Sequence, residues 1–370
     1  MGKKLKSMRE KLAKIAAQRT QFSFKLDACS TDQEEIKKRQ TTSKINRATI
    51  VGRQKEKDDI VTLLKSDEEQ ETLVIPIFGF GGIGKTTLAK LVFNDDRMQD
   101  FDLRVWVYVS PHFDLEMIGK SIISQIKQPV EGLDDLQSVS NCLEEALGGR
   151  SCLIVLDDVW ESNFFQLDKL RLMLSNFKEK SNIKIIVTTR TEEVASNIGT
   201  VTPYKLKALS DDHCWTLFKH MAFQSGFSCR EDKNVLDKIG WDIAKKCQGV
   251  PMAAQALGFM LRNKSVEEWK KVRDSDIWDG SSTTDMLPSL KLSYYQMTDY
   301  LKLCFSYCSV FPKGCEIHRG DLIQQWISLG FIPSSLGEHL TLEKIGENYV
   351  NELLGMSFLQ YSRPTSLVSD

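Results

Sequence analysis

The sequence lacks a large net charge, a long hydrophobic run and a regular cysteine framework. Its 370 residues contain 49 Lys plus Arg against 50 Asp plus Glu, so overall charge gives no reason to expect nucleic-acid or membrane-surface binding. No run of about eighteen apolar residues is present, so no transmembrane segment is expected. The nine cysteines are scattered and contain no C-x2-C pair. This pattern favours reduced thiols in a cytosolic or nuclear protein over a disulfide framework or a zinc site.

The N-terminal segment differs from the rest of the chain in charge and periodicity. Leu5, Met8, Leu12 and Ile15 recur at three- and four-residue spacing, which predicts a helix over residues 3–28 with a short coiled-coil or bundle seam. Its many lysines and arginines indicate a solvated face, and contact with acidic lipid is the alternative. Residues 29–48 are polar and predict a linker.

A regular alternation of apolar strands and amphipathic helices follows. Strands are expected at Thr72–Phe78, Leu103–Val109, Cys152–Leu156 and Ile183–Thr188. Between them, helices are expected at Lys85–Asn94, Leu115–Ile126 and Leu136–Leu147. This order predicts an α/β fold with a parallel, doubly wound sheet. Beyond about residue 210 the pattern predicts helices only, and therefore an all-α region, with helices at 212–222, 234–246, 252–261, 266–272, 287–295, 300–309, 319–329 and 342–354.

The strongest motif is a glycine-rich loop between the first strand and the first helix. G-x-x-x-x-G-K-[ST] is complete at Gly79-Phe80-Gly81-Gly82-Ile83-Gly84-Lys85-Thr86. Such a loop directs backbone amides at phosphate oxygens, and the helix N-terminus adds a partial positive charge. Lys85 is expected to reach the β- and γ-phosphates, and Thr86 to bind Mg²⁺. With the next residue, Thr87, these positions predict an ATP- or ADP-binding P-loop.

Two later strands end in charged residues at the same sheet edge. Asp157 and Asp158 follow the apolar run Cys152–Leu156, as in a Walker B strand. Asp157 is expected to hold Mg²⁺, and Asp158 to polarise an attacking water if hydrolysis occurs. Arg190 follows the fourth strand and could stabilise a γ-phosphate, although a surface arginine is an equal alternative.

These motifs, in this order, resemble the NB-ARC module of plant intracellular immune receptors from about Thr49 to the end of the chain. Leu156–Trp160 resembles the kinase-2 motif of the coiled-coil class, and Arg190 closes a Thr-Thr-Arg motif. The resemblance implies that Val51, Gly52 and Arg53 pack on adenine. It also implies that Pro251, within Gly-Val-Pro-Met-Ala, touches the base. Cys304–Pro312 resembles a motif of the winged-helix subdomain.

The resemblance also implies a domain plan and a function. The plan is a P-loop nucleotide-binding domain at 49–208, a helical ARC subdomain at 209–280 and an incomplete winged-helix ARC subdomain at 281–370. Such modules bind ADP at rest and ATP when active, with Mg²⁺, and weak ATPase activity resets the switch. Their activation leads to plant defence and a hypersensitive response. The expected setting is cytoplasmic, with nuclear or peripheral membrane association as alternatives.

The same resemblance suggests partners and two missing segments. Self-association, other immune receptors, host guard proteins or pathogen-derived molecules are the expected partners. Most of a coiled-coil domain is expected to be missing before the linker. The Met-His-Asp motif and leucine-rich repeats are expected to be missing after Asp370.

The sequence leaves three other functional hypotheses open. A P-loop kinase or helicase would need an acceptor pocket or nucleic-acid motifs, and the sequence shows neither. A DNA-binding regulator would use Arg319–Leu329 as a recognition helix, but that segment is largely apolar. A scaffold fragment with an inactive site is the third possibility.

Overall fold

The computed structural model describes residues 43–45, 47, 50–66, 72–109, 113–126, 133, 135–175, 177, 181–223, 232–278, 288–311, 317–333 and 341–359. The helix predicted at 3–28 and most of the predicted linker lie outside these residues. Across the described ranges, no helix is long and apolar enough to cross a membrane.

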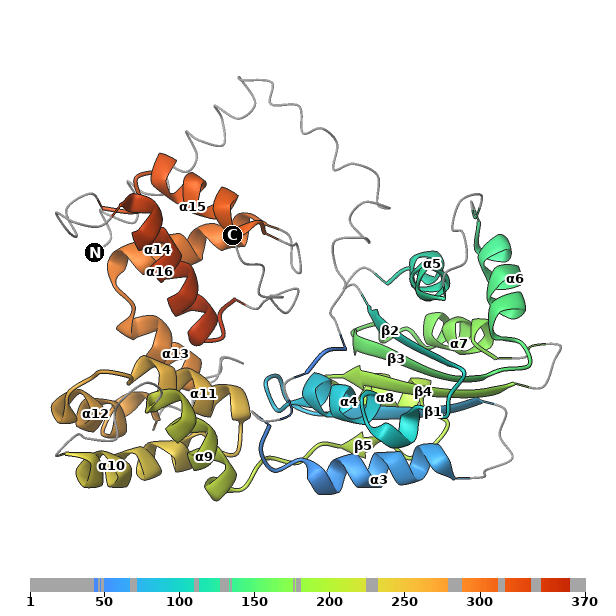
Figure 1. Cartoon of the computed structure of the whole chain (residues 1–370), viewed down its shortest axis with the longest axis horizontal. Coiled ribbons are helices and arrows are strands. Elements are labelled where there is room, and N and C mark those ends of the chain that lie inside the picture. Colours follow the sequence, from blue (N-terminus) through green and yellow to red (C-terminus); the bar gives the residue numbers. More distant parts are fainter. Residues whose placement is uncertain are drawn as a thin grey trace. The chain divides into compact units, whose positions relative to one another are not determined.

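A five-stranded, all-parallel sheet forms the first half of the described fold (Figure 1). The strands are β1 (Thr72–Phe78), β2 (Leu103–Tyr108), β3 (Ser151–Val159), β4 (Asn182–Thr189) and β5 (Tyr204–Lys205). Their spatial order is β2-β3-β4-β1-β5. The four predicted strands are confirmed, although β3 extends beyond Leu156. The two-residue β5 was not predicted, because so short a strand has no readable periodicity.

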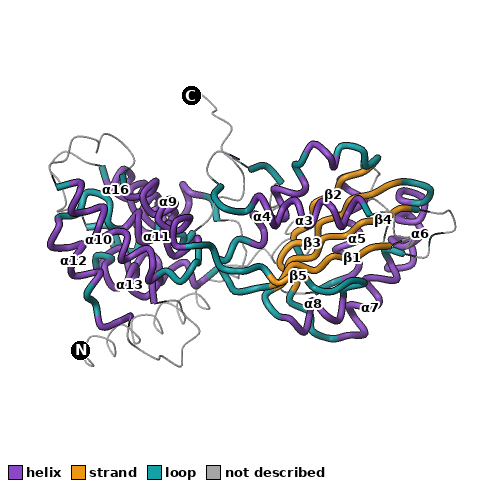
Figure 2. Tube along the Cα trace, turned by 90° about the horizontal axis from the view of Figure 1, so that it is seen from below, coloured by secondary structure: helices purple, strands orange, loops and turns teal. Residues whose placement is uncertain are grey.

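Helices cover both faces of the sheet, which explains why its strands are continuously apolar. One face carries α3 (Gln54–Lys65) and α4 (Lys85–Phe93). The other face carries α5 (Leu115–Gln125), α6 (Leu136–Leu147), α7 (Phe164–Met173) and α8 (Glu192–Ile198). Figure 2 shows α3 and α4 on one side of the strands and α7 and α8 on the other. Helices α3, α7 and α8 were not predicted from the sequence.

Alternation along β1 divides its side chains between two hydrophobic cores. Leu73, Ile75 and Ile77 pack with α3 and α4, while Val74 packs in the core beneath α5 to α8.

Pro76 is tolerated within this strand for a backbone reason. Backbone groups of Val74 and Phe78 form hydrogen bonds with Thr200 and Leu206, on one side of β1. Pro76 lies midway between these two residues in the strand, so its missing N–H would face the same side, where few backbone hydrogen bonds form.

The second half of the described chain is helical, as predicted. A first group comprises α9 (Asp211–Ala222), α10 (Lys233–Lys246), α11 (Pro251–Met260) and α12 (Val266–Arg273), followed by the 3-10 turn η4 (Asp276–Trp278). Phe218 and Trp269 are fully buried among these helices, with their rings edge to face at 5.5 Å. Side chains of Ser210 and Ser265 cap α9 and α12 by accepting backbone N–H bonds, which explains where these helices begin.

A second helical group has its own core. It comprises α13 (Pro288–Gln296), α14 (Asp299–Tyr307), the 3-10 turn η5 (Cys308–Val310), α15 (Arg319–Ser328) and α16 (Leu342–Gly355). Trp326 and Leu353 are completely buried at its centre. No strand is present among the described residues between 288 and 359.

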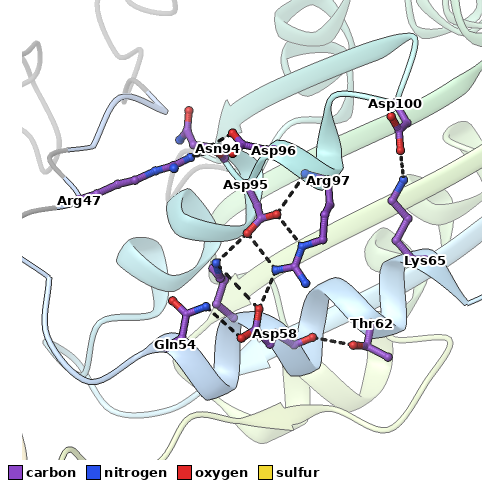
Figure 3. Close-up of polar contacts among 11 residues, drawn as sticks. Arg47, Gln54, Asp58, Thr62, Lys65, Asn94, Asp95, Asp96, Arg97 and Asp100 are labelled. Atoms are coloured by element: carbon purple, nitrogen blue, oxygen red, sulfur yellow. Dashed lines mark hydrogen bonds and ion pairs between the residues drawn. The ribbon is translucent and has the colours of Figure 1, made fainter.

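A compact charge network joins α3 to the 3-10 turn η2 (Asp96–Met98) that follows α4 (Figure 3). Asp95 accepts bonds from Arg97 Nε at 2.7 Å and Nη2 at 3.0 Å, and Lys57 Nζ lies 2.7 Å away. Arg97 also donates to Asp58 on α3 at 2.6 Å. The hydrogen bonds from Arg97 hold the pKa of Asp95 well below its usual range.

Replacing Asp95 by Asn should reduce stability in a pH-dependent way. Because its folded pKa is depressed, the ionised carboxyl contributes stability above its unfolded pKa near 3.8, and this contribution is lost as pH falls further. We expect Asp95→Asn to lower the free energy of unfolding by about 1–3 kcal/mol at neutral pH, with a smaller difference toward about pH 3.

Urea unfolding at several pH values measures this difference. The matched control is Asp100→Asn, because Asp100 forms an exposed pair with Lys65 that should contribute less than about 0.5 kcal/mol. Equal effects of the two substitutions would contradict the assigned role of the network.

Candidate nucleotide-binding site

The loop between β1 and α4 has the backbone expected of a phosphate cradle. Gly82 and Gly84 adopt φ values of 78° and 101°, which side chains rarely tolerate. Gly84 is the N-cap of α4, and a Cβ built there would meet no atom within 4 Å. The loop therefore keeps open space at the helix N-terminus, where backbone amides and the helix dipole favour an anion.

Lys85 lies in the first turn of α4 and is folded back over this loop. Its side chain is buried, and Nζ donates to the carbonyl oxygens of Gly79 at 2.8 Å and Phe80 at 3.1 Å. Burial, with the nearby positive charge of Arg190, lowers the pKa of Lys85 to about 8. The ammonium group is thus held by neutral carbonyls, an arrangement that fits an anionic ligand.

Asp157 is the most buried carboxylate of the candidate site. Its Oδ1 accepts hydrogen bonds from Thr86 Oγ1 at 2.8 Å and Thr188 Oγ1 at 2.6 Å. Burial raises the pKa of Asp157, while the two hydroxyl bonds act in the opposite direction. The structure therefore brings together the two residues predicted to hold Mg²⁺, although they lie 71 residues apart in the chain.

A β-bulge at the end of β3 directs the two aspartates differently. The pairing of β3 with β4 shifts between Leu156 and Val159, and Asp158 has a left-handed φ of 61°. Its backbone N–H donates to Thr188 Oγ1 at 2.8 Å. The side chain of Asp158 instead faces Arg190, whose Nε lies 3.8 Å from its Oδ1. Bulges and strained residues of this kind are common beside functional sites.

The start of α11 meets the P-loop from the helical half of the chain. Pro251 occupies the first turn of α11, and the next backbone amide, of Met252, faces the Gly82 carbonyl oxygen at 3.4 Å. A Cβ built on Gly82 would come within 2.9 Å of Met252 Cβ. The structure therefore places Pro251 beside the phosphate loop.

Arg53 has contacts that the sequence did not reveal. Its buried guanidinium donates to the carbonyl oxygens of Ile83 at 2.8 Å and Lys207 at 3.0 Å, and pairs with Glu56 at 2.7 Å. These bonds hold the P-loop and the segment after β5 together. A direct contact of Arg53 with adenine stays a prediction.

His213 is a second residue near the site whose position the sequence did not reveal. Gly52 has a φ of 71°, and a Cβ there would lie 2.4 Å from His213 Nδ1, so the ring packs directly on this glycine. Neighbouring Val51 packs at the edge of the adjoining core. No spacing rule connects His213 with Gly52, because the tertiary fold alone brings α9 to this segment.

Among the described residues from 288 to 359, α15 is the segment that a DNA-binding interpretation would use. Leu322, Ile323 and Trp326 of α15 are buried in the core, and Arg319 bonds to Asn351 of α16 at 3.1 Å. No observation thus favours α15 as a DNA-recognition helix. Within the described ranges, no cluster of three or more His, Cys, Asp or Glu side chains could hold a metal ion.

Comparison with known proteins gives this architecture a family. Residues 53–227 match the NB-ARC domain, and residues 310–368 match the disease resistance protein winged helix domain. The chain is 39% identical over 367 residues to disease resistance protein RGA2 of Solanum bulbocastanum, covering 97% of this chain and 37% of that protein. It is 31% identical over 349 residues to disease resistance protein RPP13 of Arabidopsis thaliana, covering 91% and 39% respectively.

A solved structure is also similar. A signal transduction ATPase with a tetratricopeptide repeat sensor from Pyrococcus horikoshii aligns with 20% identity and a TM-score of 0.45, covering 73% of this chain and 36% of that one. The chain spans less than two-fifths of the length of the two disease resistance proteins it was compared with. With its parallel P-loop sheet, helical region and winged-helix match, the chain belongs to the NB-ARC family of disease resistance proteins and carries their nucleotide-binding module.

Proposed function

We propose that this chain is an ADP/ATP-binding molecular switch of the plant innate immune response, reset by slow ATP hydrolysis. The observation that carries this proposal is the cluster at the carboxyl edge of the sheet. There, the ammonium group of Lys85 is held by loop carbonyls, and Thr86 is bonded to Asp157 at 2.8 Å. Such a cluster suits a polyphosphate with its cation.

The P-loop from Gly79 to Thr86, with Thr87, would bind the phosphates through backbone amides and the Lys85 ammonium group. Thr86 and Asp157 would hold Mg²⁺, because both present hard oxygen atoms at one point. Bound Mg²⁺ would neutralise charge on the β- and γ-phosphate oxygens.

Hydrolysis would depend on the two charged residues that lie beyond this point. Asp158 would orient a water molecule and accept its proton. Arg190 would stabilise charge on the terminal phosphate. Arg190 Nε lies 3.8 Å from Asp158 Oδ1, so the two groups would act at one place in the site.

The switch would act through segments that join the loop to the helical half. On the base side, Val51, Gly52, Arg53 and Pro251 would pack on adenine. Arg53 also holds the loop carbonyl of Ile83, so base binding and loop position would be coupled.

The proposed units are a nucleotide-binding domain at 49–208, a helical subdomain at 209–280 and a winged-helix subdomain at 281–370. The proposed location is cytoplasmic. The proposed partners of the protein are further copies of the chain, other immune receptors, and host guard or pathogen-derived proteins.

Identification of the nucleotide released by denaturing the purified chain tests the function. We expect ADP in the native protein and at least about tenfold less in Lys85→Ala, because the loop then lacks its cation. Lys65→Ala is the control, since Lys65 forms an exposed ion pair on α3. An empty native site that also fails to bind added ADP would refute the proposal.

ADP affinity should fall as pH rises, because Lys85 must be charged to hold phosphate. With a pKa of about 8 in the free protein, the ammonium group is increasingly deprotonated above that pH. We expect affinity to fall about tenfold between pH 7 and pH 9 by calorimetry. Lys85→Arg should bind more weakly but show little pH dependence, since guanidinium stays charged. The same slope in both proteins would assign the titration to another group.

Asp157→Asn should separate stability from function. Burial raises the folded pKa of Asp157, so its charge costs stability at neutral pH, and Asn removes that charge while keeping an acceptor oxygen for Thr86 and Thr188. Without nucleotide and Mg²⁺, we expect the free energy of unfolding to rise by on the order of 1 kcal/mol. The additional stabilisation by Mg²⁺ with ADP should disappear.

Thermal unfolding with and without Mg²⁺ and ADP measures both effects. Asp102→Asn is the control, because Asp102 is an exposed carboxylate that accepts one backbone bond, from Ser151, at 2.8 Å. If Asp157→Asn keeps the full Mg²⁺ effect, the metal role of Asp157 is wrong.

A further inference from the structure

We propose that Trp160 is a positioning residue of the nucleotide site, whose indole face holds the Arg190 guanidinium over the P-loop. This inference rests on the proposed function, because it concerns how the site distinguishes ATP from ADP. Trp160 would touch neither nucleotide nor metal. It would act on the terminal phosphate through Arg190 alone.

Three contacts define the position of the Arg190 guanidinium. Its Cζ lies 4.3 Å from the centroid of the Trp160 ring, and its Nε lies 3.8 Å from Asp158 Oδ1. A Cβ built on Gly81 would lie 3.5 Å from Nη1. The guanidinium therefore lies over the indole ring, while its Nη1 end lies beside the phosphate loop.

The β-bulge in β3 creates this pairing. Before the bulge Leu156 pairs with Val187, and after it Val159 pairs with Thr189, so the offset between paired residue numbers changes from 31 to 30. Continuing that register by one residue places Trp160 opposite Arg190. The same local irregularity therefore gives Asp158 its left-handed backbone and gives Arg190 its aromatic neighbour.

The ion pair with Asp158 restrains Arg190 only weakly. The 3.8 Å separation is near the limit of an ion pair, and the Arg190 side chain is 46% exposed, so solvent screens the attraction. A flexible arginine would then sample many rotamers. Stacking on an aromatic ring restricts the guanidinium without neutralising its charge, so the cation remains available to an anion.

The exposure of Trp160 separates this role from core packing. It is 37% exposed and belongs to none of the three hydrophobic cores of the described residues. A residue needed only for packing would be buried. ADP lacks the phosphate that Arg190 would reach, so the stack should matter more for ATP.

The test compares ATP and ADP affinities, measured by calorimetry with an ATP analogue that resists hydrolysis, in the full chain. We expect Trp160→Ala to weaken binding of the ATP analogue by about threefold to tenfold and to change ADP binding by less than about twofold. Trp160→Phe should retain most of the ATP affinity, because phenylalanine also offers a ring face. Phe165→Ala is the control, since Phe165 is a nearby aromatic on α7 that is 75% exposed.

The outcomes separate this inference from the proposed function. If the wild-type chain binds both nucleotides but Trp160→Ala leaves their affinity ratio unchanged, or Trp160→Phe is no better than Trp160→Ala, the positioning role is wrong and the switch proposal stands. If the wild-type chain binds neither nucleotide, both are wrong. Unchanged thermal unfolding and retained ADP binding of Trp160→Ala show that a selective loss of ATP-analogue affinity in this variant does not arise from misfolding.

Discussion

The candidate site depends on one buried carboxylate, that of Asp157. Its Oδ1 accepts from Thr86 on α4 and from Thr188 on β4, and the residue itself lies on β3. Three elements thus meet at one oxygen atom, within a region where an unpaired charge would be costly. This point fixes α4, and with it Lys85, relative to the ends of the strands.

Around this point, glycines allow distant segments to approach the loop. Gly82 lies against Met252 at the start of α11, and Gly52 lies against the ring of His213. A side chain at either glycine would need both an unfavourable backbone and space that is already occupied. The phosphate loop is therefore in direct contact with the helical half, and the proposed switch would act through this contact.

Membership of the NB-ARC family and the observed geometry support each other at different levels. The family match assigns a nucleotide-binding module to residues 53–227. The geometry then gives individual side chains distinct tasks, such as the bond of Arg53 to the loop carbonyl of Ile83. Through that bond Arg53 holds the P-loop in position, a role that a motif alone does not reveal.

The sequence by itself determined the strand–helix order, the P-loop and the approximate bounds of most helices. These features depend on local periodicity and on a contiguous motif, so neighbouring residues suffice to specify them. It did not reveal β5 or α3, α7 and α8. Only the tertiary structure decided that Asp157 bonds Thr188, that His213 packs on Gly52 and that Trp160 stacks on Arg190. Those contacts depend on strand register, a bulge and helix packing, which join residues far apart in the chain and leave no periodic signal.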